Sequence, residues 1–218
     1  MELWTHAFSA RRALLHGAKL AEDGGWDGLS VVDSQNLSGD SFIALAQAAN
    51  VTSRLKLQTG VTNSITRNAA AVACAIATVQ SISRGRAVCG IGRGDSALAH
   101  LGRAPAKLAQ FERYMRHHQA YLSGDHVPFE EIGDIALEAA PPMSELQLAE
   151  APADSHIGWI AETQKGDRKV PVEVAASGPK VIAIAARTAD RVVFTLGAST
   201  ERLRWGRSGP RGAHRSRP

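Results

Sequence analysis

The 218-residue sequence lacks any apolar run long enough to span a membrane, for which a helix needs about 20 residues. It has only two cysteines, Cys74 and Cys89, and both lie at apolar positions without a neighbouring ligand motif. We interpret them as buried, reduced thiols rather than as a disulfide or a metal site. Residues 1–8 show no basic stretch followed by an apolar core, so the default expectation is a cytoplasmic protein without a membrane partner.

The main part of the chain also lacks an excess of positive charge, although the whole sequence carries a formal net charge of +4. Residues 201–218 contain six arginines and one glutamate, a net charge of +5, which leaves −1 for residues 1–200. Binding to nucleic acid needs clustered positive charge, so we expect no nucleic-acid partner. From Trp205 onward the composition becomes Arg, Gly, Ser and Pro, and we predict a basic, disordered tail over residues 201–218.

The segment from Leu55 to Asp95 predicts a strand, a polar turn, a helix and a second strand. Residues 55–59 form a β-compatible run closed by Gly60, and residues 69–83 form an apolar, alanine-rich helix. Residues 86–91 return as a strand that ends in glycines, so the unit is βαβ with parallel strands. Polar residues and glycines gather at the strand ends, which is where α/β folds keep their chemistry.

Alternating strands and helices continue along the chain and predict an α/β fold. Residues 123–169 contain four prolines and no firm periodicity, and we interpret them as an insertion within a domain of residues 1–200. Six strands in this order predict a (β/α)8 TIM barrel with about six of its eight units, the last two missing. The further strands are expected at 1–4, 28–32, 170–175 and 191–196, and the further helices at 9–23, 40–49, 105–122, 179–188 and from 200.

A dinucleotide-binding fold is the alternative that the glycines at 90–95 bring to mind. Gly90, Gly92 and Gly94 follow the pattern G-x-G-x-G, whereas the dinucleotide motif is G-x-G-x-x-G. The strand that carries them is also the fourth in the chain rather than the first. We therefore do not expect a Rossmann fold.

Residues 60–97 (GVTNSITRNAAAVACAIATVQSISRGRAVCGIGRGDSA) and 173–198 (EVAASGPKVIAIAARTADRVVFTLGA) carry a family resemblance. They resemble the bacterial luciferase-like superfamily of flavin and deazaflavin oxidoreductases. Within it, the chain is most similar to the methylenetetrahydromethanopterin reductase branch, which uses coenzyme F420. The resemblance covers residues 1–122 and 170–200, and it implies a luciferase-like TIM barrel with F420, or alternatively FMN, as its cofactor.

The resemblance also implies which residues hold the cofactor. Gly60 and Val61 occupy the place where the family has a non-prolyl cis peptide bond behind the ring, and Thr62 and Asn63 would hydrogen-bond the ring edge. Gly92, Gly94 and Asp95 would let the cofactor approach the mouth of the barrel. The places where the family holds the cofactor phosphate correspond to Ser177, Gly178, Gly197 and Ala198.

The residues Ser177-Gly178-Pro179 support a phosphate site on physical grounds as well. They place an open turn at the start of a predicted helix, with proline at the first helical position. The free N–H groups and the helix dipole at such a position favour an anion. The alternative is that Ser177 only caps its helix.

His6 and Asp33 are the candidate catalytic residues, because they stand at the ends of the first two predicted strands. Hydride transfer often needs a proton donor or acceptor beside the positioned ring, and both side chains can serve. His100, His117 and His118 show no ligand spacing, so we expect no metal site.

Three functions remain open from the sequence. The first is an oxidoreductase that transfers hydride between F420 and a small organic substrate, which the GVTN and GIGRGD strand ends favour. The second is an FMN-dependent monooxygenase of the same fold, and the third is a truncated relative that binds a flavin or is inactive. The open edges of an incomplete barrel further predict a homodimer. Nothing in residues 123–169 identifies the substrate.

Overall fold

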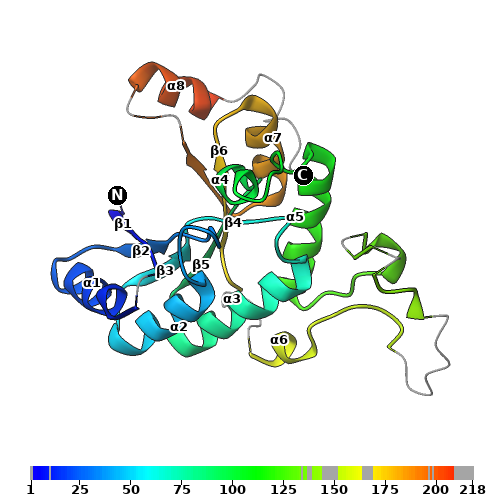
Figure 1. Cartoon of the computed structure of the whole chain (residues 1–218), viewed down its shortest axis with the longest axis horizontal. Coiled ribbons are helices and arrows are strands. Elements are labelled where there is room, and N and C mark those ends of the chain that lie inside the picture. The colour runs from blue at the N-terminus through cyan, green and yellow to red at the C-terminus, as the bar shows by residue number, and fades with distance from the viewer. Residues whose placement is uncertain are drawn as a thin grey trace.

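The computed structural model describes residues 2–9, 11–133, 135–136, 139–143, 152–163, 169–195, 197 and 199–208. The strands are β1 (Trp4–Ala7), β2 (Gly28–Val31), β3 (Lys56–Thr59), β4 (Thr62–Asn63), β5 (Ala87–Gly92), β6 (Val172–Ala176) and β7 (Arg191–Phe194). They form one curved sheet in the order β1-β2-β3-β5-β6-β7, with the short β4 paired to β5, and all pairs are parallel (Figure 1). Strand order follows chain order, as in a (β/α) barrel, so the sheet is an incomplete barrel of this type.

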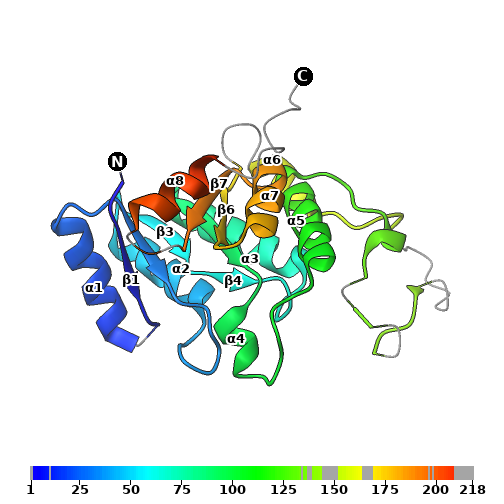
Figure 2. The same ribbon diagram turned by 90° about the horizontal axis from the view of Figure 1, so that it is seen from above.

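Helices follow the strands and cover the outer face of the sheet (Figure 2). Consecutive helices of this layer pack side by side: α1 (Arg11–Asp23), α2 (Ser41–Val51), α3 (Ala69–Ser83), α5 (Leu108–Ser123) and α7 (Pro179–Thr188). The short α4 (Asp95–Ala99) follows β5, and α8 (Thr200–Ser208) follows β7. The segment between α5 and β6 extends away from the sheet and contains the 3-10 helix η1 (Phe129–Glu131) and α6 (Gly158–Thr163).

The two faces of the sheet differ in polarity because neighbouring residues of a strand point to opposite sides. Leu57, Ile91 and Val174 point to the helices and are completely buried in the core. Gln58 and Glu173 point to the concave face, where Gln58 Nε2 donates a 2.6 Å hydrogen bond to Glu173 Oε1. This bond joins β3 to β6 across the intervening β5, which the curvature of the sheet makes possible.

The predicted order of six strand and helix units is confirmed, but several boundaries were wrong. The first strand, expected to begin within residues 1–4 and to end at His6, is Trp4–Ala7, and its pairing with β2 aligns Trp4 with Gly28. Residues 95–99, which fall before the helix expected at 105–122, form the separate helix α4. Thr62 and Asn63, predicted in a turn, pair with β5 as β4.

The helix expected from residue 200 is confirmed as α8, Thr200–Ser208, which extends into the segment 201–218 that was also predicted as a basic, disordered tail. Residues 209–218 lie outside the described residues. Within the described part of the chain, no helix combines the length and the apolar character needed to cross a bilayer.

The two cysteines are free thiols, but only one of them is buried as predicted. Cys89 lies in β5 with no exposed surface, and this burial raises the pKa of its thiol to about 12. Cys74 is exposed on α3, so its predicted burial is wrong. The apolar composition of α3 concealed this, since its solvent face carries small residues rather than charged ones.

Candidate functional site

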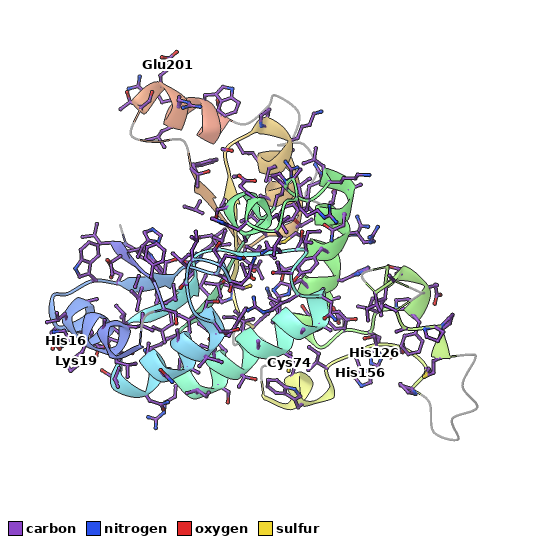
Figure 3. All side chains as sticks on the ribbon, viewed as in Figure 1. His16, Lys19, Cys74, His126, His156 and Glu201 are labelled. Atoms are coloured by element: carbon purple, nitrogen blue, oxygen red, sulfur yellow. The ribbon has the colours of Figure 1, made fainter. Side chains whose placement is uncertain are left out.

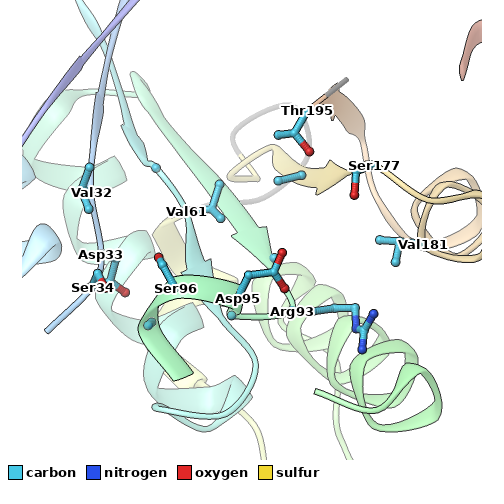
Figure 4. Close-up of a pocket in the computed structure, with 15 residues that line it drawn as sticks. Val32, Asp33, Ser34, Val61, Arg93, Asp95, Ser96, Ser177, Val181 and Thr195 are labelled. Carbon is cyan, nitrogen blue, oxygen red and sulfur yellow. The ribbon is translucent and has the colours of Figure 1, made fainter. Parts of the chain in front are cut away.

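A cleft of about 340 Å³ opens at the carboxyl ends of the strands (Figure 4). Its volume falls within the range of about 300–1,000 Å³ that is typical of small-molecule sites. The sequence-predicted residues that line it are Asp33, Gly60, Val61, Gly92, Gly94, Asp95 and Ser177. The cleft therefore brings together residues from the ends of β2, β3, β5 and β6.

The structure adds lining residues that sequence reasoning missed. Ser96 stands at the start of α4, Val181 in the first turn of α7, and Thr195 directly after β7. Each lies within a few residues of a strand end or a helix start. The general rule that loops at the carboxyl ends of barrel strands build the site could have pointed to them.

Two glycines allow neighbouring groups to approach closely at the cleft wall. A Cβ atom on Gly60 would collide with Ser30 Oγ, and one on Gly92 would lie 3.0 Å from Val61 Cγ2. The Gly60–Val61 peptide bond is cis, as the resemblance implied. Because Gly60 and Gly92 have no side chains, Ser30 and Val61 can pack closely against them where the two glycines line the cleft.

Thr62 and Asn63 are buried behind the cleft and are not among its lining residues. Asn63 Oδ1 accepts hydrogen bonds from the N–H groups of Ile65 at 3.0 Å and Thr66 at 2.9 Å. Asn63 Nδ2 donates to Thr66 Oγ1 at 3.0 Å. The side-chain amide is thus engaged in shaping the loop after β4.

Asp33 lies at the cleft within an ion-pair network. Arg67 Nη1 donates to Asp33 Oδ2 at 2.7 Å, and Arg67 Nη2 donates to Asp40 Oδ2 at 2.8 Å. Asp40 also caps α2, and the guanidinium carbon lies 5.0 Å from the Phe42 ring centroid. Burial acts to lower the pKa of Arg67, but the attraction of the two carboxylates outweighs it and raises the pKa.

The remaining predicted residues are not part of the cleft lining. His6 is exposed on β1, where it pairs in register with Ser30. Gly178 is the N-cap residue of α7, and Gly197 is exposed with a φ of 72°. Ala198 lies outside the described residues.

Two groups at the cleft have unused hydrogen-bonding capacity. Ser34 Oγ is buried without a hydrogen-bond partner among the described residues, and Ser34 lines the cleft. The first turn of α7, at Lys180 and Val181, presents N–H groups that no carbonyl within the helix can accept. Together with Gly60 and Gly92 in the cleft wall, these groups suit a flat, polar ligand that carries an anionic group.

The model of the luciferase-like monooxygenase family matches residues 3–217. The chain belongs to this family. The 5,10-methylenetetrahydromethanopterin reductase of Methanolobus tindarius is 31% identical to this luciferase-like chain over 183 residues, which cover 83% of this chain and 49% of the relative. The chain spans about half the length of the curated relatives it matches. The family that the sequence resembles is thereby confirmed.

Solved structures confirm the fold of this luciferase-like chain. The coenzyme F420 dependent tetrahydromethanopterin reductase of Methanopyrus kandleri superimposes with a TM-score of 0.65 at 22% identity, covering 89% of this chain and 55% of that one. The monooxygenase RslO1 of Streptomyces bottropensis gives a TM-score of 0.68 at 19% identity, covering 98% and 65%. At these identities the likeness concerns the fold alone.

Proposed function

We propose that this chain is an oxidoreductase that transfers hydride between coenzyme F420 and a small organic substrate. The observation that carries the proposal is the cleft at the strand ends, where Gly60, Val61 and Gly92 line a space of a size suited to a small cofactor. The 31% identity to a methylenetetrahydromethanopterin reductase and the F420 dependence named for a structural neighbour support this cofactor. A deazaflavin of this kind supplies hydride transfer when bound.

The proposal assigns the ring and the phosphate to different parts of the cleft. The ring would lie against Gly60, Val61 and Gly92, with Gly94 and Asp95 at the mouth and Ser34 Oγ available to its polar edge. The phosphate would lie at the first turn of α7, beside Ser177 and Gly178, with Gly197 and Ala198 continuing the site. Lys180, the second residue of that helix, adds a positive charge there.

Asp33 and His6 remain the candidates for proton transfer, and their positions assign them different roles. Asp33 lines the cleft, where its carboxyl group is held in place by Arg67. His6 lies on the concave side of β1, since it is in register with Ser30, whose hydroxyl lies against Gly60. We propose that His6 acts only on a substrate large enough to reach β1.

An FMN-dependent monooxygenase is the second candidate. The monooxygenase RslO1 shares the fold over 98% of this chain, and the cleft features that suit a deazaflavin ring suit a flavin ring equally. FMN reacts with oxygen after reduction, whereas deazaflavins carry hydride. The identity of the bound cofactor therefore separates the two functions.

Equilibrium binding of F420 and of FMN to the purified chain, followed by fluorescence, tests the proposal. We expect saturable binding of F420 that is at least about tenfold tighter than that of FMN. Ser177→Asp should weaken binding by about tenfold or more, because it places a negative charge beside the proposed phosphate. Ser81→Asp is the matched control, because Ser81 is exposed in the last turn of α3 and is not among the residues that line the cleft. This variant should leave cofactor binding unchanged.

Each other outcome has a defined meaning. If the chain binds FMN more tightly than F420, the FMN-dependent monooxygenase becomes the proposed function in place of the F420-dependent oxidoreductase. Binding of neither cofactor by a folded chain would favour a relative without turnover. Equal weakening by both serine variants would contradict the placement of the phosphate at α7.

We further propose that two copies of the chain associate. Among the described residues, β1 and β7 are the two ends of the sheet path, so each pairs on one side only. Their free N–H and C=O groups can pair with another chain. Sedimentation velocity at micromolar concentration should show a dimer, and a single monomeric species would contradict the association.

A further inference from the structure

A cluster of two histidines and one aspartate lies in the segment between α5 and β6, away from the cleft. His126 and His156 are next to each other on this segment, beyond the helical layer (Figure 3). His126 Nδ1 lies 2.6 Å from Asp154 Oδ1, and His156 Nδ1 lies 3.3 Å from the same oxygen. The centroids of the two imidazole rings are 4.3 Å apart. The three ligand atoms all lie within 4.8 Å of one another.

The backbone explains why these side chains meet. Val127 and Ser155 form an antiparallel bridge in which each N–H donates to the other residue's carbonyl, at 2.8 Å and 3.0 Å. The adjacent pair, His126 and His156, is therefore a non-hydrogen-bonded pair, the arrangement that brings facing side chains closest. Asp154 precedes His156 by two residues and so points to the same side. Three ligands thus share one face of a short ribbon.

The ribbon is anchored to the core from its opposite face. Val127 is 2% exposed and belongs to the hydrophobic core. Ser155 Oγ and Tyr121 Oη, on α5, are 2.7 Å apart in a hydrogen bond. At the end of α5, the N–H of Asp125 donates to Ala120 O at 2.9 Å, which fixes the approach to His126. The cluster is therefore exposed but held in place before any ligand binds.

The chemistry of the three groups selects a class of metal. Imidazole nitrogen suits zinc, copper and nickel, whereas calcium and magnesium prefer oxygen ligands alone. Zinc binds nitrogen and oxygen at about 2.0–2.2 Å, so tetrahedral ligand atoms are about 3.3 Å apart. The His156 Nδ1-to-Asp154 Oδ1 distance of 3.3 Å matches that separation, and the His126 Nδ1-to-Asp154 Oδ1 distance of 2.6 Å is a hydrogen bond that would lengthen when a metal ion replaces the proton.

We propose that His126, Asp154 and His156 form a site for one divalent transition metal ion of the zinc class. Coordination would join residue 126 to residues 154–156 and close the loop between them. The metal would therefore stabilise this segment, and the site stands independently of the cofactor cleft. The sequence had predicted no metal site, because His126 and His156 are distant along the chain.

Calorimetric titration of the tag-free, EDTA-treated full chain with zinc chloride tests the site. We expect binding of one equivalent and a higher melting temperature with zinc. His156→Ala and Asp154→Asn should each weaken binding by about tenfold or more, because each removes one ligand. His16→Ala is the matched control, since His16 is exposed on α1, and it should bind zinc like the parent chain.

A second measurement does not depend on the folding of the variants. In the 15N-labelled parent chain, zinc should shift the imidazole resonances of two of the eight histidines, assigned to His126 and His156. Absence of saturable binding would overturn the site. So would shifts confined to other histidines, or unchanged affinity in a folded His156→Ala variant.

Discussion

Arg67 donates a 2.7 Å hydrogen bond to Asp33, which joins the loop before α3 to the end of β2 at the cleft. The Asp33 side chain is 6% exposed and that of Arg67 is 28% exposed, so the pair is largely shielded from solvent. A buried carboxylate without its partner is costly, because neither water nor another charge compensates it. Arg67 is thus the residue that permits a carboxylate at this position.

Removal of Arg67 should destabilise the protein. We expect Arg67→Met to lower the free energy of unfolding by about 2 kcal/mol or more, since Asp33 loses its only ion pair among the described residues. Urea denaturation measures the change. Lys19→Met breaks the exposed pair with Asp23 and should change the free energy of unfolding much less, because solvent screens an exposed ion pair. Equal losses in the two variants would show that burial of Asp33 contributes nothing.

Glu22 should make stability depend on pH in the acid range. Its carboxylate, 6% exposed, accepts hydrogen bonds from the N–H groups of Ser53, Arg54 and Leu55. Burial acts to raise the pKa of Glu22, but these hydrogen bonds outweigh it and lower the pKa from 4.5 to about 2. A lowered pKa stabilises the folded state above the unfolded value of 4.5, and this stabilisation is lost as pH falls towards 2.

Glu22→Gln is the variant that isolates this effect. At pH 7 we expect a loss of about 3 kcal/mol in the free energy of unfolding, from the size of the shift. The difference between the parent and the variant should shrink as pH falls from 5 towards 2. Urea denaturation at several pH values measures it. A difference that is constant with pH would show that the loss comes from packing rather than from the charge.

Two glycines should respond in opposite ways to alanine. Gly17 lies within α1, and nothing lies within 4 Å of the place that a Cβ atom would take there, so Gly17→Ala should stabilise the protein by about 0.5–1 kcal/mol. A Cβ atom on Gly90 would collide with Thr59 O and lie 2.6 Å from Gln58 Nε2. Gly90→Ala should therefore destabilise by about 1–3 kcal/mol. Thermal unfolding distinguishes the signs, and a stabilised Gly90→Ala would contradict the close approach of β3 and β5.

The two cysteines should differ in reactivity. Cys74 is exposed, whereas Cys89 is completely buried and its pKa is raised to about 12, so it holds little reactive thiolate. Mass spectrometry after brief treatment with N-ethylmaleimide should show one modified thiol in the folded chain. Cys74→Ser should abolish this labelling, and denaturant should expose Cys89. Labelling of both cysteines at equal rates in the folded chain would contradict the burial of Cys89.

Local patterns were sufficient for much of the fold. The helices at Ala69–Ser83 and Pro179–Thr188 begin and end where the sequence predicted, because a cap residue or an N-terminal proline marks their starts. Asn68 caps the first of them by accepting the N–H of Ala71 at 2.7 Å. Such signals lie within a few residues of the feature that they determine.

Contacts between distant segments were beyond such patterns. The register of β1 against β2, in which Trp4 aligns with Gly28, depends on two strands separated by a whole helix, and the sequence made no prediction of it. The hydrogen bond from Arg67 to Asp33 likewise joins residues 34 positions apart, and no local pattern predicted it. The propensity of a short segment to form a helix or a strand contains no information about which polar groups of distant segments it will contact.

The sequence by itself determined the alternation of strands and helices, the family, and the glycines that stand at the strand ends. These follow from hydrophobic periodicity and from backbone requirements, which act over a few residues. Only the tertiary structure decided that Arg67 pairs with Asp33, that Gln58 meets Glu173 across the concave face, and that His126 meets His156. These pairs form because packing of the helices and curvature of the sheet set the distances between segments that are far apart in the chain.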